Sequence, residues 1–149
     1  MEKLEKKREQ SLQALTTLQT AIDTFKKISN KELDPCPQID YEQLYLMSRD
    51  SMVQRFEYCT DLFWKYLKKY IEIVSETTIE YNSPKPVIRQ AYSVGILSEK
   101  ETESSLQLIK DRNLTSHIYK EEIAEHLTKT IPKYYNLMQA IIKRLQSGK

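Results

Sequence analysis

The stretch that decides the fold is MVQRFEYCTDLFWKYLKKYIEIV, residues 52–74. Its apolar and aromatic side chains recur in alternating steps of four and three residues, the spacing of one face of a helix packed against another helix. Further apolar residues lie outside that face, although a surface helix needs only one apolar stripe. The sequence therefore predicts a helix buried on two sides, one in the intramolecular bundle and one against a partner subunit in a homodimer. The face consists of Met52, Phe56, Cys59, Phe63, Tyr66, Tyr70 and Ile73, and the apolar residues outside it are Val53, Leu62, Trp64, Leu67, Ile71 and Val74.

The chain on the N-terminal side of this stretch predicts two helices separated by a loop. The first covers residues 4–28, where apolar residues recur at three- and four-residue steps. Asn30 and the proline-containing segment 34–37 end it. The second helix begins near Asp40, a favourable N-cap residue, and continues through the opening stretch to about Ser75.

Three further helices are predicted after the opening stretch. Residues 77–81 have some strand character, but no second strand pattern exists to pair with them, so we interpret them as a helix end and a loop. Ser83–Pro84 then provides an N-cap and a proline at the first helical position of a short helix, which Gly95 ends. A capping box at Ser98–Glu101 opens the next helix.

The last helix is expected over residues 120–145, with one apolar stripe and a kink at Pro132. Four long helices, one short helix and compact turns predict one domain, residues 1–149, of the all-α class: an antiparallel four-helix bundle with one additional short helix. A content of only two glycines and five prolines agrees with this fold class.

The charge of the chain does not by itself select a partner, because the formal net charge is only +2. The C-terminal segment 126–149 is different, because it holds five Lys or Arg residues and no acidic residue. This excess fits either basic residues that complement the C-terminus of a helix or an anionic partner such as RNA.

Several classes of protein are excluded by missing patterns. Cys36, Cys59, His117 and His126 share no metal-ligand spacing, and no glycine-rich phosphate loop exists, so no metal and no cofactor is predicted. Cys59 lies on the apolar face and is expected to be a reduced, buried thiol. The charged first ten residues do not fit a signal peptide, and no apolar run reaches the ~20 residues of a membrane span. We expect a soluble, cytoplasmic protein.

The stretch DRNLTSHIY, residues 111–119, carries the chemistry. On an unbroken helix Arg112 and His117 would diverge by ~140°, so they converge only if the helix ends between them or if each works with a symmetry mate. The acidic turn that follows Tyr119 indicates such a break near residues 115–119. His126 is expected to be a surface or packing histidine.

An arginine and a histidine together suit cleavage of RNA without a metal. The 2′-hydroxyl needs a proton acceptor, the leaving oxygen needs a proton donor, and a histidine exchanges protons near neutrality. An arginine presents a planar, charged fork to the phosphate oxygens. Since the spacing alone is unspecific, the alternative is a structural pair, with Arg112 in a salt bridge and His117 capping a helix.

Residues 112–119 resemble the Arg-x4-His-x-Tyr motif of the HEPN superfamily, and more narrowly its nucleotidyltransferase substrate-binding protein subfamily, which includes the HepT toxins. Three other segments are similar to that family in the same order: residues 49–65 to its second helix, residues 83–97 to its short helix, and residues 121–124 to the start of its last helix. The resemblance covers roughly residues 49–137, and the first helix agrees only in periodicity.

The resemblance implies a dimeric helical bundle in which motif residues of both subunits form one cleft with metal-independent endoribonuclease activity. Arg112 would then stabilise the phosphate, His117 would be the general acid and base, and Asn113 would orient them. It also implies a cognate minimal nucleotidyltransferase as antitoxin, which transfers AMP from ATP to Tyr119 and silences the nuclease. Lys120 stands where relatives commonly carry an acidic or amide residue, which bears on how that partner recognises Tyr119.

Two hypotheses of other classes remain beside the ribonuclease. The first is a non-catalytic adaptor that binds a nucleotidyltransferase and presents substrate to it, which the two-sided apolar helix fits equally well. The second is a structural helical dimer without a further function, which no feature of the sequence excludes.

Overall fold

The computed structural model describes residues 2–32 and 39–147, which form five α-helices and one short 3₁₀ turn and contain no strand. The predicted all-α class, the order of the helices and the loop at residues 77–81 are confirmed. The predicted stop at residues 34–37, with Cys36, lies outside the described residues. The elements are α1 (Glu2–Ser29), α2 (Tyr41–Val74), α3 (Pro84–Ser93), α4 (Glu99–Leu114), the 3₁₀ turn η1 (Thr115–His117) and α5 (Glu121–Ser147).

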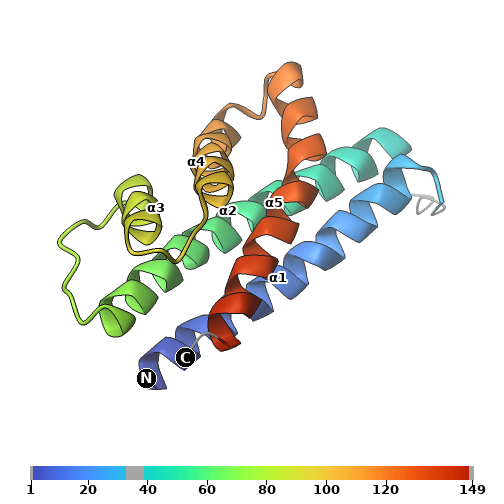
Figure 1. Cartoon of the computed structure of the whole chain (residues 1–149). Coiled ribbons are helices and arrows are strands. Elements are labelled where there is room, and N and C mark those ends of the chain that lie inside the picture. The colour runs from blue at the N-terminus through green and yellow to red at the C-terminus, as the bar shows by residue number, and fades with distance from the viewer. Residues whose placement is uncertain (1, 33–38, 148–149) are drawn as a thin grey trace.

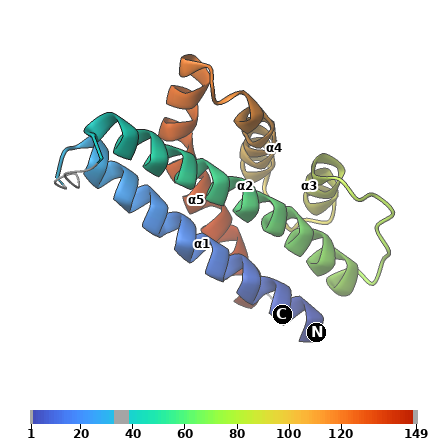
Figure 2. The same cartoon turned by 180° about the vertical axis from the view of Figure 1, so that it is seen from behind.

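Helix α2 is the central element of the bundle. Figures 1 and 2 show α1 running antiparallel beside α2 along most of its length, with α3 and α4 on the other side. Helix α5 packs against α1, α2 and α4, so it covers both sides of the central helix at once. The C-terminal end of α5 lies close to the start of α1 (Figure 1).

The two-sided burial predicted for α2 is present, but other helices of the same chain bury both sides, without a second subunit. Trp64 and Leu67, which lie outside the seven-residue face, are 7% and 0% exposed in the monomer. Of the two apolar sets, only Val74 is exposed, and Leu62 and Ile73 are partly buried. These two sets of residues are therefore no argument for a second copy, and a homodimer has to rest on other features.

The helix ends follow from local hydrogen bonds. The Asp40 carboxylate accepts a hydrogen bond from the Gln43 amide at 2.8 Å and caps α2. Ser98 and Glu101 form the reciprocal capping box that opens α4. Gly95 has a φ of +81°, and the amides of Gly95 and Ile96 donate back to the last turn of α3, the arrangement that a left-handed C-terminal glycine permits.

The kink predicted in the last helix agrees with the shape of α5. Pro132 lies inside α5, where its ring removes one backbone donor and crowds the preceding turn. Both views of the fold show α5 changing direction near its middle (Figures 1 and 2). The part of α5 after Pro132 bonds both to α1, where Tyr135 donates to Gln19, and to α4, where Arg144 donates to Glu101.

No helix among residues 2–32 and 39–147 combines the length and the apolar character that a membrane span requires.

Burial of Cys59 makes the stability of the fold sensitive to alkaline pH. Burial raises the pKa of this thiol from 9.0 to about 12, so the folded protein keeps it protonated where the unfolded chain ionises it. The stabilising contribution is present below pH 9 and is lost as the pH rises above 9. Between pH 7.5 and pH 10 we expect the free energy of unfolding of the wild-type protein to fall by about 1.4 kcal/mol more than that of Cys59→Ala. Urea denaturation of both proteins at both values of pH measures this difference, and equal losses would contradict it.

Candidate functional site

The predicted break between Arg112 and His117 is present. Helix α4 ends at Leu114, and a single 3₁₀ turn, Thr115–His117, leads to α5. The Thr115 hydroxyl donates to the Arg112 carbonyl at 2.8 Å, and the amide of Ile118 donates to the Thr115 carbonyl at 3.3 Å. These short-range bonds tighten the chain into a 3₁₀ turn and prevent α4 from continuing.

The side chain of Arg112 is bound to two carboxylates of α2. Its Nε and Nη2 donate to the two oxygens of Asp61 at 3.3 and 3.2 Å, and its Nη1 lies 3.3 Å from Glu57 Oε2. A fourth contact joins Nη1 to the Thr115 hydroxyl at 3.4 Å. The guanidinium therefore ties the end of α4 to α2, as the structural interpretation of this arginine predicted. It is still 27% exposed, so an anion can approach it.

His117 and Tyr119 face each other in the exposed joint between α4 and α5. His117 Nδ1 lies 3.3 Å from the Tyr119 hydroxyl, and the two rings meet edge to face with centroids 5.9 Å apart. Tyr119 is 74% exposed, and Lys120 Nζ lies 6.0 Å from the centre of its ring. A group attached to the Tyr119 hydroxyl would thus stand directly beside the imidazole.

The motif residues form two separate contacts within one chain. Among the described residues, no hydrogen bond joins Arg112 to His117, and the exposed side chain of Asn113 bonds to neither of them. Next to Arg112 and Asn113 there is a hollow of about 360 Å³, whose wall on α2 includes Asp61, Trp64 and Lys65. This hollow offers a cation and an indole to an anionic or aromatic ligand.

A buried carboxylate precedes the motif arginine in the chain. Asp111 is 1% exposed and accepts hydrogen bonds from the Tyr134 hydroxyl, from His126 Nε2 at 2.9 Å and from Gln107 Nε2 at 3.2 Å. Burial, together with the Asp111 hydrogen bond and charge, holds the pKa of Tyr134 well above its usual value. Consequently Asp111 ties α4 to α5, while its neighbour Arg112 ties α4 to α2.

This cluster has no counterpart among the sites predicted from the sequence. Its members lie on two helices, so no single periodic pattern contains them. The spacing gave one signal, because Asp111 stands three residues after Leu108 and four before Thr115, on the same side of the chain. All three residues are buried in the structure, so the carboxylate lies on the inner face of α4. His126 was expected to be a surface or packing histidine, and its side chain is 46% exposed and bound to Asp111.

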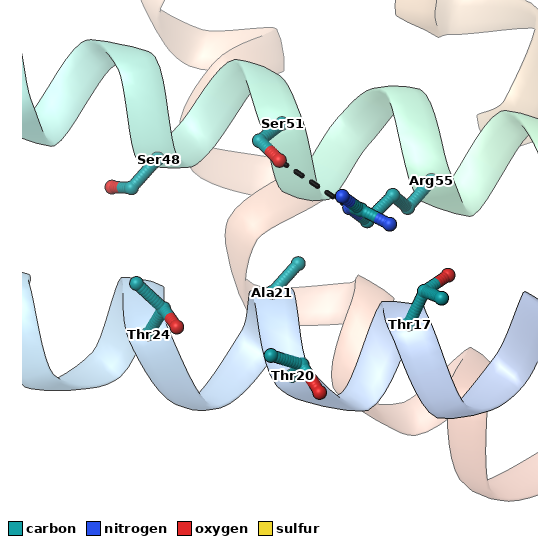
Figure 3. Close-up of a pocket in the computed structure, with 7 residues that line it drawn as sticks. All are labelled: Thr17, Thr20, Ala21, Thr24, Ser48, Ser51 and Arg55. Carbon is teal, nitrogen blue, oxygen red and sulfur yellow. Dashed lines mark hydrogen bonds between the residues drawn. The ribbon is translucent and has the colours of Figure 1, made fainter.

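A second region of interest is a polar groove between α1 and α2. Two adjoining hollows of about 300 and 630 Å³ share Thr17, Ser51 and Arg55. Figure 3 shows the guanidinium of Arg55 lying between the two helices, with its Nε 3.5 Å from the Ser51 hydroxyl. The wall contains no Lys, Asp or Glu, and its other members are Gln10, Gln13, Ala14, Thr20, Ala21, Thr24, Ser48, Gln54 and Tyr58. This groove was not predicted from the sequence.

These features define a class of protein: an all-helical bundle with an arginine at the end of its fourth helix and a histidine and a tyrosine in the exposed joint that follows. The chain belongs to the family described as nucleotidyltransferase substrate binding protein like, whose model matches residues 13–147. It is also similar to a protein of Thermus thermophilus of known crystal structure, with 35% identity over 86% of this chain and 98% of that chain and a TM-score of 0.63. A comparison with curated proteins gives no match. The family resemblance drawn from residues 49–137 is therefore confirmed.

The hydrogen bond from Tyr134 to Asp111 is expected to stabilise the fold. Removing the hydroxyl takes one of three donors from a buried carboxylate, so Tyr134→Phe should lower the free energy of unfolding by about 1.5–3 kcal/mol. Tyr92→Phe is the matched control, because Tyr92 is 49% exposed and its change should stay within about 0.5 kcal/mol. Urea denaturation at pH 7 measures both. Equal stability of the two variants would show that Asp111 does not need this donor.

Proposed function

We propose that this protein is a metal-independent endoribonuclease of the HepT type, and that AMP transfer to Tyr119 by a cognate minimal nucleotidyltransferase silences it. The observation that supports this most is the contact of His117 Nδ1 with the Tyr119 hydroxyl in the exposed joint. One short segment then holds both the proton-transfer group and the group whose modification would block it. The family to which the chain belongs provides the expected partner class.

The chemistry assigned to the site follows from its charges. Arg112 would bind the phosphate and offset the charge that develops on it, because the guanidinium donates in a fixed fork. The carboxylates of Asp61 and Glu57 already accept from this guanidinium. A phosphate therefore has to displace one of these carboxylates or share the guanidinium donors with it. His117 would take up the proton of the 2′-hydroxyl, for which it is accessible in the joint.

A homodimer is part of this proposal. Arg112 and His117 do not bond to each other within one chain, although both are expected to act on one phosphate. A second copy would let Arg112 of one subunit work with His117 of the other. The support for the dimer comes from this division of the motif and not from the apolar surface of α2.

Silencing by AMP has a direct physical basis in this geometry. Transfer to Tyr119 would place a bulky anionic group on a hydroxyl oxygen that lies 3.3 Å from His117 Nδ1. That group would repel the RNA backbone and occupy the space in front of His117. The 74% exposure of Tyr119 leaves its hydroxyl open to the active site of a transferase.

Cleavage of a labelled single-stranded RNA in the presence of EDTA tests the ribonuclease. We expect His117→Ala to lower the rate by about 10²–10⁴-fold and Arg112→Ala by about 10²–10³-fold, because they remove proton transfer and charge stabilisation. Arg89→Ala is the matched control, since Arg89 is an exposed arginine of α3 outside the site, and it should cleave like the wild type. If the wild-type protein leaves the RNA intact, the proposed ribonuclease activity is wrong.

Co-expression with the cognate nucleotidyltransferase tests the silencing. Mass spectrometry should find AMP on Tyr119, and the modified protein should no longer cleave RNA. Tyr119→Phe should remain an active nuclease in the presence of the transferase, because it lacks the acceptor hydroxyl. Tyr58, which is 60% exposed, serves as the internal control and should stay unmodified. Loss of nuclease activity without modification of Tyr119 would contradict silencing by AMP transfer.

The second candidate function is a non-catalytic adaptor that presents a substrate to the nucleotidyltransferase. The polar groove between α1 and α2 favours it, because hydroxyls, amides and Arg55 line a hollow of ligand size whose wall includes no residue of the motif. The cleavage assay separates the two candidates. Binding of the transferase does not, because both predict it.

A further inference from the structure

The hollow beside Arg112 adjoins the point where the proposed ribonuclease would hold its substrate. Its volume is about 360 Å³, and Arg112 and Asn113 form part of its wall. A phosphate in RNA is joined on each side to a ribose that carries a base, so a phosphate on Arg112 brings one of these two nucleosides next to the hollow. Resting on the ribonuclease proposed above, we infer that the hollow binds a base that flanks the scissile phosphate, and that this base is a purine.

Part of the wall is apolar and buried, as a base requires. Trp64 of α2 and Ile109 of α4 are 7% and 2% exposed, and Pro84 lines the hollow at the start of α3. The flat faces of a base are apolar, and proteins bind the bases of single-stranded RNA against side chains of this kind. The volume lies near the lower end of the range of about 300–1,000 Å³ for small-ligand pockets, which suits one base better than a longer segment.

Two other side chains of the wall can recognise the edge of a base. Asn113 and Lys65 are exposed, and Asn113 bonds to neither Arg112 nor His117. The amide of Asn113 presents a donor beside an acceptor, which matches N7 and the 6-amino group of adenine. The ammonium of Lys65 only donates, which matches N7 and the 6-oxygen of guanine. Both purines have N7 and pyrimidines lack it, so both side chains favour a purine.

The charges of the wall also admit an anionic nucleotide. Asp61 lines the hollow, but its two oxygens accept from Arg112 at 3.3 and 3.2 Å, so its negative charge is paired. Lys65 Nζ lies 5.7 Å from the centre of the Trp64 ring and forms no salt bridge with the residues that the structure describes. Lys65 therefore offers an unpaired cation to the ligand.

The base preference of the wild-type protein tests this inference. Cleavage of a single-stranded RNA with random bases, followed by sequencing of the ends, shows whether a position beside the cut is selective. Two RNAs that differ only at that base are then mixed, and the ratio of their kcat/KM is measured. We expect a purine to be preferred over a pyrimidine by about 5–150-fold, as for one paired contact to a base edge. The corresponding 7-deazapurine, in which carbon replaces N7, should lose most of this preference.

Substitutions of the two side chains show which purine is recognised. Asn113→Ala should abolish a preference for adenine and Lys65→Met a preference for guanine, because each removes the donor to N7. The ratio of two RNAs in one mixture is unaffected by a general loss of activity. Asn136→Ala is the matched control and should keep the wild-type ratio, since Asn136 is an exposed asparagine of α5 that does not line the hollow.

The outcomes distinguish the hollow from the ribonuclease. Equal cleavage beside purines and pyrimidines, or a preference that survives the 7-deazapurine, would overturn the purine site and leave the ribonuclease standing. A preference that survives both substitutions would do the same. The 7-deazapurine measurement uses the wild-type protein, so it does not depend on the activity of either variant. A wild-type protein that cleaves no RNA would overturn the ribonuclease and the purine site together.

Discussion

The need to cover α2 on two sides shapes the whole bundle. Aromatic and aliphatic residues surround this helix, so α1 lies along one side, α3 and α4 lie along the other, and α5 packs against α1, α2 and α4. Glu57 and Asp61 lie on the exposed margin of the same helix, where the end of α4 meets it. The position of the candidate site is therefore a consequence of how the central helix is buried.

Two consecutive residues at the end of α4 then point in different directions, because neighbours on a helix are about 100° apart. Asp111 reaches α5 and Arg112 reaches α2, so three helices are joined within one turn. A buried carboxylate is costly unless donors surround it, and Asp111 has three. Beyond this end of α4, the side chains of His117 and Tyr119 contact each other and lie in the exposed joint. The end of α4, held by these ion pairs and hydrogen bonds, and the exposed joint with His117 and Tyr119 thus follow each other directly in the chain.

The helices and the break in the motif could be predicted because their causes are local. Asp40, Gly95 and the capping box at Ser98 act on backbone groups a few residues away, and the 3₁₀ turn at residues 115–117 is closed by its own neighbours. The contacts of the site could not be predicted in the same way. Arg112 meets Asp61 across 51 residues, and His126 meets Asp111 across a break that ends any helical periodicity.

The sequence by itself determined which segments are helical, where they end, that the central helix is buried on two sides, and which family the motif indicates. These properties depend on periodicity and on hydrogen bonds within a turn or two. Only the tertiary structure decided that the chain's own helices cover both sides of α2, that Arg112 is held by two carboxylates, and that His126 is bound to a buried aspartate. Burial and charge pairing join residues that the fold brings together, and their spacing in the chain does not reveal them.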